Sequence, residues 1–448
     1  MRQRDILWFW LPLFASWLLM TAEGPLISAA INRLPNEVIM LAAQGIVISL
    51  SVMIESPIIN MLSTSTALVR DYQSYAVVRK FTIHWAVILT LITIAIAFTP
   101  LFDMVVVGWL EAPAAVAQWV QPGLQIMTLW SAAIAWRRFL QGVLIHFDMT
   151  KQVAHGTAVR LLATGGVVTS LALWTEWPGV NIAATALMTG VITEALFATW
   201  AVRPLFQTHL SPDTATEGDP LTYRDLFWFH LPLASTSVLI LMAQPLVTSS
   251  LARLDNPTES LAAWPVLFQM MLVARAAAFA LPEVVIALTK GAQSFAPIRR
   301  FSLMLTAVTT TAMFLFVFTP ASRFYVFTLQ DMTDTTGELA RSVLSLFLFF
   351  PALATITSWF RGLLISQRST KAVNQGMIIN LIIMGVILLI GLQLQWLGLH
   401  TAAIALNTAS FFETIYLGWR TQRVLPDGLS LLRINPQVKR NWRLETGD

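Results

Sequence analysis

Charged side chains inside long apolar runs are the residues best able to do chemistry in this chain. Glu55 stands in the apolar run 41–69, beside Pro57, and Arg275 stands in the run 261–290. A charge in hydrocarbon costs at least about 2.5–3.5 kcal/mol, so it implies a partner, a cavity or a function. Because Arg275 comes 220 positions after Glu55, we expect the two to form a split charge pair that acts as a gate. Alternatively they form a static ion pair, or each has a partner in its own half of the chain.

Glu23 is the candidate for ion coupling. It precedes Gly24 and Pro25 in the first apolar run, and Gly and Pro loosen a helix and free backbone carbonyls. A carboxylate at such a point is suited to take a proton or Na⁺ and to couple that event to helix bending. The alternative is a position near the outer end of the helix, in contact with water.

Other charges lie within the runs or near their ends. Glu283 is expected either as a second carboxylate of the cleft, about two turns beyond Arg275, or as a side chain that reaches toward the cytoplasmic end of its helix. Arg138 and Arg361 are candidates for substrate binding, although long arginine side chains at this depth also reach the headgroups. The remaining expectations are headgroup anchors at Arg137 and Arg160, a structural role shared by Glu194 and Glu413, interfacial positions for His84 and His230, and helix bends at Pro25, Pro57, Pro245 and Pro282.

The composition indicates that these groups lie in membrane-spanning segments. The 448 residues are 56% hydrophobic and 12% charged, whereas an ordinary soluble protein carries about 25% charged residues. Apolar runs long enough to cross about 30 Å of hydrocarbon recur throughout. The chain has no cysteine, and no metal-ligand spacing, phosphate-binding glycine loop or catalytic cluster is present. We therefore expect an all-α polytopic membrane protein that is not an enzyme, has no metal or cofactor and binds no nucleic acid.

Twelve membrane spans are predicted, with both termini in the cytoplasm. Most of the 28 lysines and arginines lie at the termini or in the loops after even-numbered spans, and such residues favour the cytoplasmic side. Only Arg33, Arg253, Arg323 and Arg341 lie in the opposite loops. The location predicted is the cell (inner) membrane.

The two halves of the chain are copies of each other. Residues separated by 220 positions repeat without a gap, as in Leu11-Pro12-Leu13 and Leu231-Pro232-Leu233, or Phe98-Thr99-Pro100 and Phe318-Thr319-Pro320. Because each half has six spans, the repeats are predicted to be parallel and related by a two-fold axis along the membrane normal. Parallel repeats of this kind build secondary transporters, with the substrate path between them.

These observations divide the chain into four parts. They are an N-terminal six-helix half (1–206), a cytoplasmic linker (207–224), a C-terminal six-helix half (225–425) and a basic cytoplasmic tail (426–448). Helices one, two, seven and eight are predicted to line a central cleft. The protein is expected to be a monomer.

Short motifs in this arrangement resemble one transporter superfamily. "FWLPLFAS" (9–16) returns as "FHLPLAST" (229–236), "SWFRGLLISQRSTKAV" occupies 358–373, and "AEGPLISAAINRLPNEVIMLAAQGIVISL" occupies 22–50. The loop "VRDYQSYAVVRK" (69–80) does not match the pattern typical of major facilitators. The chain resembles the MOP superfamily, which includes multidrug and toxic-compound extrusion (MATE) proteins, lipid-linked oligosaccharide flippases and progressive ankylosis (ANK) proteins; the segment 22–50 is most similar to the last.

The resemblance implies an exporter of a small organic solute that works by alternating access and is driven by H⁺ or Na⁺. It implies Glu23 as the coupling carboxylate, because a helix-one carboxylate has that role in some multidrug exporters. An ankylosis-like protein would export pyrophosphate, nucleotide or citrate-like anions, and Arg275, Arg138 and Arg361 would suit them since arginine binds carboxylate and phosphate bidentately. A lipid-linked precursor flippase is a further alternative.

Overall fold

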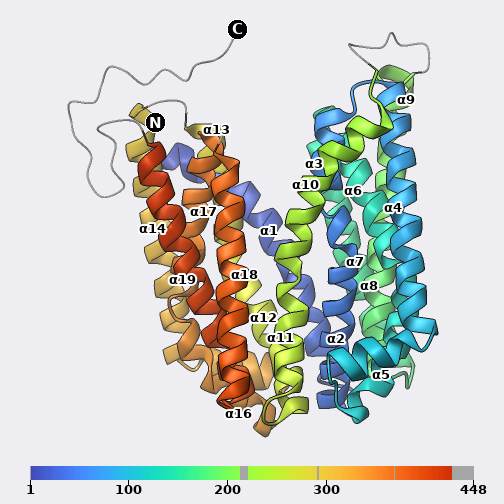
Figure 1. Cartoon of the computed structure of the whole chain (residues 1–448), viewed down its shortest axis with the longest axis vertical. Coiled ribbons are helices and arrows are strands. Elements are labelled where there is room, and N and C mark those ends of the chain that lie inside the picture. Colours follow the sequence, from blue (N-terminus) through green and yellow to red (C-terminus); the bar gives the residue numbers. More distant parts are fainter. Residues whose placement is uncertain (1, 212–219, 290–291, 368, 426–448) are drawn as a thin grey trace. The chain divides into compact units, whose positions relative to one another are not determined.

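The chain is entirely helical where its structure is described. The computed structural model describes residues 2–211, 220–289, 292–367 and 369–425 (Figure 1). Within these ranges the regular secondary structure consists of helices, with no β-strand. This confirms the predicted all-α class. The predicted tail 426–448, and the centre of the predicted linker, lie outside the described residues.

Long helices alternate with short helical segments along the chain. The long helices are α1 (Gln3–Ile31), α2 (Glu37–Glu55), α4 (Tyr72–Phe98), α6 (Trp130–His146), α7 (Thr150–Trp174), α8 (Gly179–Val202), α10 (Tyr223–Leu241), α12 (Pro257–Phe279), α14 (Ala292–Phe318), α17 (Phe350–Ser366), α18 (Thr370–Gln393) and α19 (Gly398–Val424). The short ones are η1 (Ser56–Ile58), α3 (Met61–Leu68), η2 (Asp103–Trp109), α5 (Ala114–Ile126), η3 (Met127–Leu129), α9 (Leu205–Thr208), α11 (Ala243–Ala252), α13 (Leu281–Leu288), α15 (Ala321–Arg323), η4 (Phe324–Leu329), α16 (Asp334–Ser342) and η5 (Leu344–Phe347).

Many of these helices are suited to cross a membrane. Among the described residues, nine helical segments are long and apolar enough, and the pair formed by α16–η5 and α17, bent by 48°, would make ten. The two other predicted spans coincide with α5–η3–α6 and with α19, which carries Asn407, Glu413 and Arg420 along its length. The protein is thus a multi-pass helical membrane protein, and the count of twelve spans stays a prediction.

The secondary structure repeats with the same offset as the sequence. Both ends of α3, α4 and α6 lie 220 positions before the corresponding ends of α13, α14 and α17. Left-handed backbone conformations recur in the same way. Asn36 and Asn256 have φ of 58° and 52°, and Glu111 and Asp331 have φ of 54° and 53°. The two copies of the sequence therefore direct the same local fold.

The chain forms two compact units, which divide it at other points than the predicted halves. Unit 1 contains residues 1–22 and 266–448, and unit 2 contains residues 23–265. Most of α1 thus packs with the second copy of the repeat, and α10 and α11 pack with the first. The first helix of each copy, α1 or α10, therefore packs mainly with the other copy, and we call these two the exchanged helices. The predicted division at 206 and 225 remains a description of the sequence repeat.

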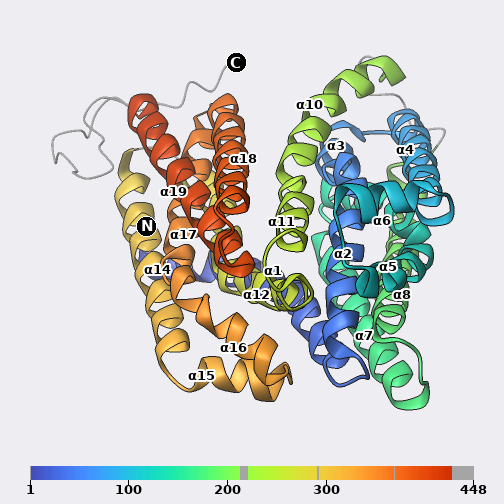
Figure 2. The ribbon, with the colours of Figure 1, turned by 60° about the horizontal axis from the view of Figure 1, so that its bottom comes forward.

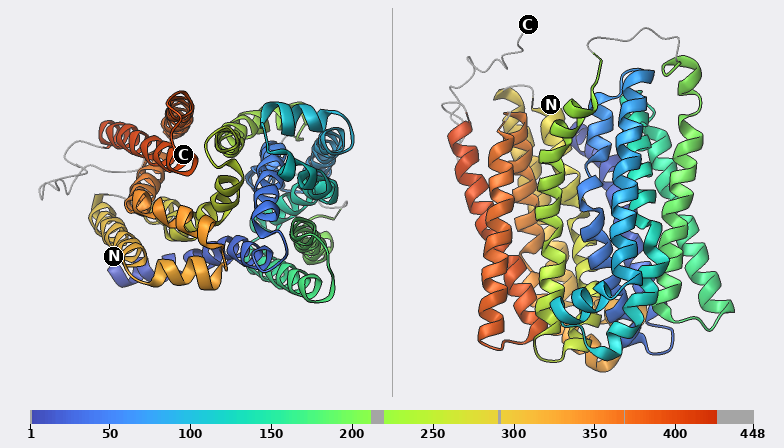
Figure 3. Two further views of the ribbon diagram at one scale, coloured as in Figure 1. Left: turned by 90° about the horizontal axis from the view of Figure 1, so that it is seen from below. Right: turned by 45° about the vertical axis from the view of Figure 1, so that its right-hand side comes forward.

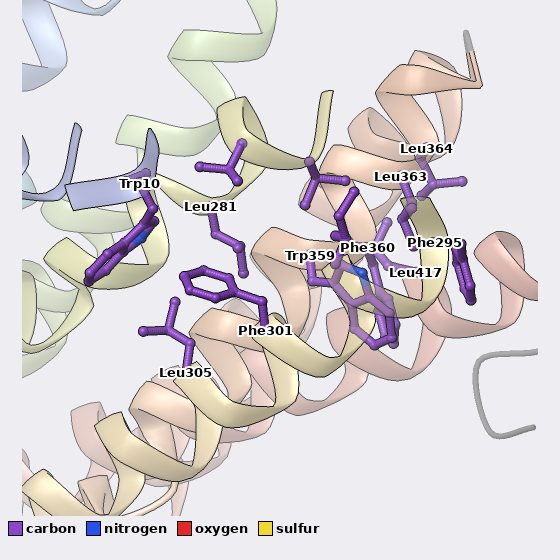
Figure 4. Packing of buried hydrophobic residues seen from close by; sticks show 14 of the residues in the cluster. Trp10, Leu281, Phe295, Phe301, Leu305, Trp359, Phe360, Leu363, Leu364 and Leu417 are labelled. Carbon is purple, nitrogen blue, oxygen red and sulfur yellow. The ribbon is translucent and has the colours of Figure 1, made fainter. Parts of the chain in front are cut away.

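Unit 1 has an aromatic core in which the exchanged α1 takes part. Trp10 of α1 stacks on Phe14 at a ring distance of 4.6 Å and meets the edge of Phe301 of α14 at 6.0 Å. Trp10, Leu281 and Phe301 lie in one buried cluster with residues of α17 and α19 (Figure 4). In the same unit α17, α18 and α19 lie side by side (Figure 2).

Three of the four prolines expected to bend helices lie at helix breaks. α2 ends at Glu55, two residues before Pro57; α13 begins one residue before Pro282, and α11 begins two residues before Pro245. Pro57 has no N–H to offer the Met53 carbonyl, and the Ser56 hydroxyl donates to that oxygen at 2.7 Å instead. Pro25, by contrast, lies within α1, which runs unbroken to Ile31.

Candidate functional site

The buried carboxylate of Glu194 is the centre of a polar cluster inside unit 2. Its side chain is 0% exposed and projects from α8 toward α6 and α7, which lie beside it (Figure 3). From α6, Arg137 Nη1 donates to Oε2 at 2.7 Å and Gln141 Nε2 donates to Oε1 at 3.0 Å. From α7, the Thr157 hydroxyl donates to Oε1 at 3.4 Å. Both carboxylate oxygens are therefore occupied by donors within the helix bundle.

A second carboxylate, Glu23 of α1, joins the cluster through α7. Arg160 binds Glu23 in the bidentate manner, with Nε donating to Oε1 at 3.1 Å and Nη2 donating to Oε2. The Thr164 hydroxyl, one helical turn further along α7, donates to Oε1 at 2.8 Å. Glu23 is only 7% exposed. The expected alternative, a Glu23 in contact with water, is thus not what the structure shows.

Arg160 lies between the two carboxylates. Its Nη1 is 3.8 Å from Glu194 Oε2 while its other nitrogens bind Glu23. Charge-assisted bidentate bonds are the strong kind, and the longer contact is weaker. A change in charge on Glu23 would therefore favour movement of the same guanidinium toward Glu194. The predicted use of Arg160 as a headgroup anchor was wrong, because the side chain points into the bundle.

A glycine permits the close approach of α7 and α8 at this site. A Cβ atom added to Gly190 would lie 2.1 Å from Thr164 Oγ1 and 3.3 Å from the Arg160 carbonyl. These distances are below van der Waals contact, so a side chain at position 190 would displace the Thr164 hydroxyl that bonds Glu23. Gly190 thus belongs to the construction of the cluster.

Glu55 and Arg138 complete the charge balance of the cluster. Glu55, the last residue of α2, is buried and has the guanidinium groups of Arg138, Arg137 and Arg160 as electrostatic neighbours. The Trp130 indole lies beside the carboxylate, and Glu55 Oε2 makes no hydrogen bond of ordinary geometry among the described residues. The cluster thus contains three carboxylates and three guanidinium groups, all of them in unit 2. This arrangement corresponds to the expected alternative in which Glu55 has partners in its own part of the chain.

Unit 1 contains a simpler counterpart of this cluster. Glu413 of α19, the repeat equivalent of Glu194, accepts hydrogen bonds from Arg361 Nε of α17 at 3.2 Å and from Asn380 Nδ2 of α18 at 2.8 Å. Arg361 Nη2 also binds Glu413 Oε1. The position equivalent to Arg160 holds Asn380, and the position equivalent to Glu23 holds Ala243. The Glu23–Arg160 pair therefore has no equivalent residues in the second copy.

Arg275 stands apart from the carboxylates of unit 1. Its guanidinium lies 5.2 Å from the ring centres of both Phe279 and Phe350, and its buried Nε has no hydrogen-bond partner among the described residues. Phe350 is the repeat equivalent of Trp130, the ring beside Glu55. Within unit 1 the electrostatic neighbours of Arg275 are Arg361 and Glu413. The predicted pairing of Arg275 with Glu55 stays a prediction.

The remaining predicted residues fall outside the clusters. Glu283, in α13, is exposed. His230, expected at the interface, is fully buried in α10 and bonds η1 and α3, so that expectation was wrong. In the described ranges no group of three or more histidine or acidic side chains is placed to hold a metal ion.

Sequence reasoning identified Glu23 but not the residues that bind it. Arg160 and Thr164 are four positions apart and therefore share a helix face, a spacing that places both on one acceptor. Nothing in the sequence links that face to a residue 137 positions earlier. The replacement of Arg160 by Asn380 in the second copy was the available signal that position 160 has a special role.

Comparison with known proteins places this fold among transporters. None of the protein-family models matches the chain, and no curated protein matches it. The chain is similar to the inward-facing structure of a multidrug resistance MATE family transporter of the MOP superfamily, with a TM-score of 0.69, 12% identity and coverage of 91% of this chain and 95% of that one. It is similar to the lipid II flippase MurJ, with a TM-score of 0.68, 14% identity and coverage of 92% and 87%. A MOP superfamily transporter from Pyrococcus furiosus, whose binding pocket is described as having reverse polarity, aligns with a TM-score of 0.63, 13% identity and coverage of 94% and 96%. The chain therefore has the fold shared by MATE transporters and other members of the MOP superfamily.

Proposed function

We propose that the protein is a secondary active transporter that exports a small organic solute by alternating access. The observation that carries this proposal is the Glu23–Arg160 pair, which the first copy of the repeat has and the second copy lacks. A pair needed only for packing would serve both copies of a repeat equally, as Glu194 and Glu413 do. The likeness of the fold to MATE transporters supports the proposal.

The geometry suits coupling to protons at Glu23. Both Glu23 oxygens accept hydrogen bonds from Arg160, and one accepts a third from Thr164. Protonation would remove the negative charge that holds Arg160 and leave Glu194, 3.8 Å away, as its strongest partner. Na⁺ would need several oxygen ligands, and its binding would have to displace the guanidinium from Glu23. H⁺ is therefore the coupling ion that we favour over Na⁺.

Export of organic anions or phosphate compounds is the second candidate. It is favoured by Arg275, which lies against two phenylalanine rings and forms no ion pair with any residue that the structure describes. Arginine on aromatic rings keeps its N–H edges available for a carboxylate or phosphate. A lipid-linked precursor is a related possibility, because its phosphates would use the same cationic group.

The proposed setting is the cell membrane, with both termini in the cytoplasm and a monomeric protein that works without a cofactor.

Gly45 supports the proposed two-fold relation of the repeats. A Cβ atom at Gly45 would lie 2.7 Å from Pro265 Cγ, and Pro265 is the residue 220 positions later. A residue that packs against its own equivalent must lie near the axis that relates the copies.

Transport by purified protein in vesicles tests this function. We would reconstitute wild type, Glu23→Gln and Glu338→Gln into vesicles, impose a pH or Na⁺ gradient, and follow the fluorescent cation ethidium and the fluorescent anion carboxyfluorescein. Glu338 is the matched control because its partner is the exposed Arg341. Gradient-driven flux should be present in wild type and Glu338→Gln and absent in Glu23→Gln. Equal gradient-driven flux in Glu23→Gln would remove Glu23 from the mechanism, and flux of the anion alone would favour the second candidate.

A further inference from the structure

Two buried aromatic N–H groups cap backbone carbonyls at equivalent places in the two units. In unit 1, Trp10 Nε1 of α1 donates to the Ala277 carbonyl at 3.1 Å. In unit 2, His230 Nε2 of α10 bonds the Pro57 carbonyl at 2.9 Å. Both the donors and the acceptors are 220 positions apart. The same hydrogen bond is therefore built twice, with a different ring supplying the proton.

Each carbonyl lies where a helix breaks. Pro57 belongs to the short η1 segment that follows the end of α2, and Ala277 lies in the last turn of α12. The final carbonyls of a helix have no partner within the helix, and an unpaired carbonyl away from water is costly. Because the donors come from α10 and α1, the exchanged helices supply the N–H groups that these carbonyls lack within their own helices.

Each capped carbonyl also lies two residues after a charged residue of an apolar helix. Pro57 follows Glu55, and Ala277 follows Arg275. The hydrogen bond to this carbonyl therefore fixes the direction of the backbone just after Glu55 in unit 2 and just after Arg275 in unit 1. In unit 2 the break is held at a second point, where Asn60 Nδ2 donates to the Leu233 carbonyl of α10 at 3.0 Å.

The surroundings of His230 fix its role as a donor. The side chain is 0% exposed and packs against the rings of Phe81 and Trp85. Its Nδ1 is 2.9 Å from the Thr64 hydroxyl, which can donate to it. A carbonyl only accepts, so Nε2 must carry the proton that bonds Pro57. Trp10 can only donate, so donation of a ring N–H is the property that the two sites share.

We propose that His230 and Trp10 are equivalent positioning residues, whose ring N–H groups hold the helix breaks that orient Glu55 and Arg275. The role in transport rests on the proposed function, whereas the role in holding the break does not. The exchanged helix of each repeat is thereby tied to the charged turn of the other repeat. A movement of α10 would be transmitted to the turn after Glu55 through the His230 and Asn60 hydrogen bonds.

A single-cysteine labelling experiment tests the inference without reference to transport. The chain has no native cysteine, so Ile59→Cys places one thiol in the break, and its rate of reaction with a small water-soluble methanethiosulfonate reports opening. In this background His230→Phe removes the N–H and keeps a ring, His230→Trp restores the donor found at the equivalent site, and His84→Phe is the control. His84 is exposed and bonds Tyr223 outside the break.

We expect His230→Phe to react about 2- to 10-fold faster than its parent, the range that corresponds to the loss of one hydrogen bond, and His230→Trp and His84→Phe to react like the parent. Equal rates in His230→Phe and the parent would overturn the proposal, as would equal acceleration by His230→Phe and His230→Trp. Should His230→Phe fail to fold, His230→Met removes the donor with a flexible side chain, and its labelling rate is interpreted in the same way.

In the vesicle assay His230→Phe and Trp10→Phe should each lower maximal flux, and His230→Trp should restore the flux that His230→Phe loses. Absence of gradient-driven flux in wild type would refute the proposed function and leave the labelling result standing.

Discussion

Glu194 and Glu413 occupy equivalent positions in the two units, and each accepts hydrogen bonds from the two long helices that precede its own. Arg137, Gln141 and Thr157 bind Glu194, and Arg361 and Asn380 bind Glu413. Each carboxylate thus ties three helices together inside its unit. The shared part of the two clusters is structural, and the additions in unit 2 are the parts that require a functional explanation.

Neutralising either glutamate should destabilise the protein. Glu194→Gln leaves the buried guanidinium of Arg137, and Glu413→Gln the partly buried guanidinium of Arg361, without its carboxylate. Removing one partner of a buried pair typically costs about 3–5 kcal/mol. Glu194→Gln should be the more damaging, because Arg137 and Arg160 both lose a partner. The thermal midpoint in detergent measures the effect.

The control for this prediction is Glu338→Gln, whose exposed pair with Arg341 should contribute at most about 1 kcal/mol. A midpoint of Glu194→Gln or Glu413→Gln equal to that of the control would show that the carboxylate contributes no net stability.

The bidentate contact between Glu23 and Arg160 should appear as an interaction energy. Glu23→Ala alone leaves Arg160 with Glu194 only, and Arg160→Ala alone leaves Glu23 with Thr164 only. The double variant removes both charges, so it should be more stable than the sum of the single effects predicts, by about 0.5–3 kcal/mol. Denaturation of all four proteins measures this energy, and additive effects would contradict the pairing.

Gly190→Ala should disturb Glu23 without touching it. The added methyl group would occupy the space of the Thr164 hydroxyl, so Thr164 must release Glu23 or α7 and α8 must separate. We expect loss of ion-coupled flux in vesicles and a destabilisation of about 1–3 kcal/mol, the usual range for overpacking. Gly166→Ala, on α7, is the control since nothing lies within 4 Å of its Cβ position. Similar flux in the two variants would contradict the role assigned to Gly190.

The sequence repeat predicted much of this architecture, but it did not predict which helices pack together or which side chains bond to each other. The offset of 220 anticipated the helix breaks after Glu55 and Arg275, and an offset of 219 in the last span of each half anticipated the equivalence of Glu194 and Glu413, because periodicity and proline act locally. It did not reveal the exchange of α1 and α10, since both helices are apolar and would bury equally well in either unit. The surroundings of His230 in α10 depend on that packing, so its expected interfacial position was wrong for this reason. The expected position of Arg160 was wrong because Glu23 binds it inside unit 2.

Glu55 should be coupled energetically to Arg138. Arg138 is a charged neighbour of Glu55 within unit 2, and none of the described residues of that unit forms an ion pair with Glu55 at contact distance. Glu55→Ala and Arg138→Ala should therefore each destabilise the protein, and the double variant should recover about 0.5–3 kcal/mol. Unfolding of the four proteins in detergent checks this, and a fully additive result would assign Arg138 to another partner.

Glu55 and Arg275 should show non-additive effects on transport if they act as the two parts of a gate. Arg275 lies against Phe279 and Phe350, and none of the described residues forms an ion pair with it. Arg275→Ala would leave the Glu55 carboxylate without its partner in the gate, so it should lower flux more than the double variant Glu55→Ala/Arg275→Ala does. The cycle with Arg138 provides the comparison, because that pair should be coupled in stability whether or not the protein transports. Additive effects of Glu55→Ala and Arg275→Ala on flux, together with coupling to Arg138, would assign Glu55 to the cluster of unit 2 and refute the gate.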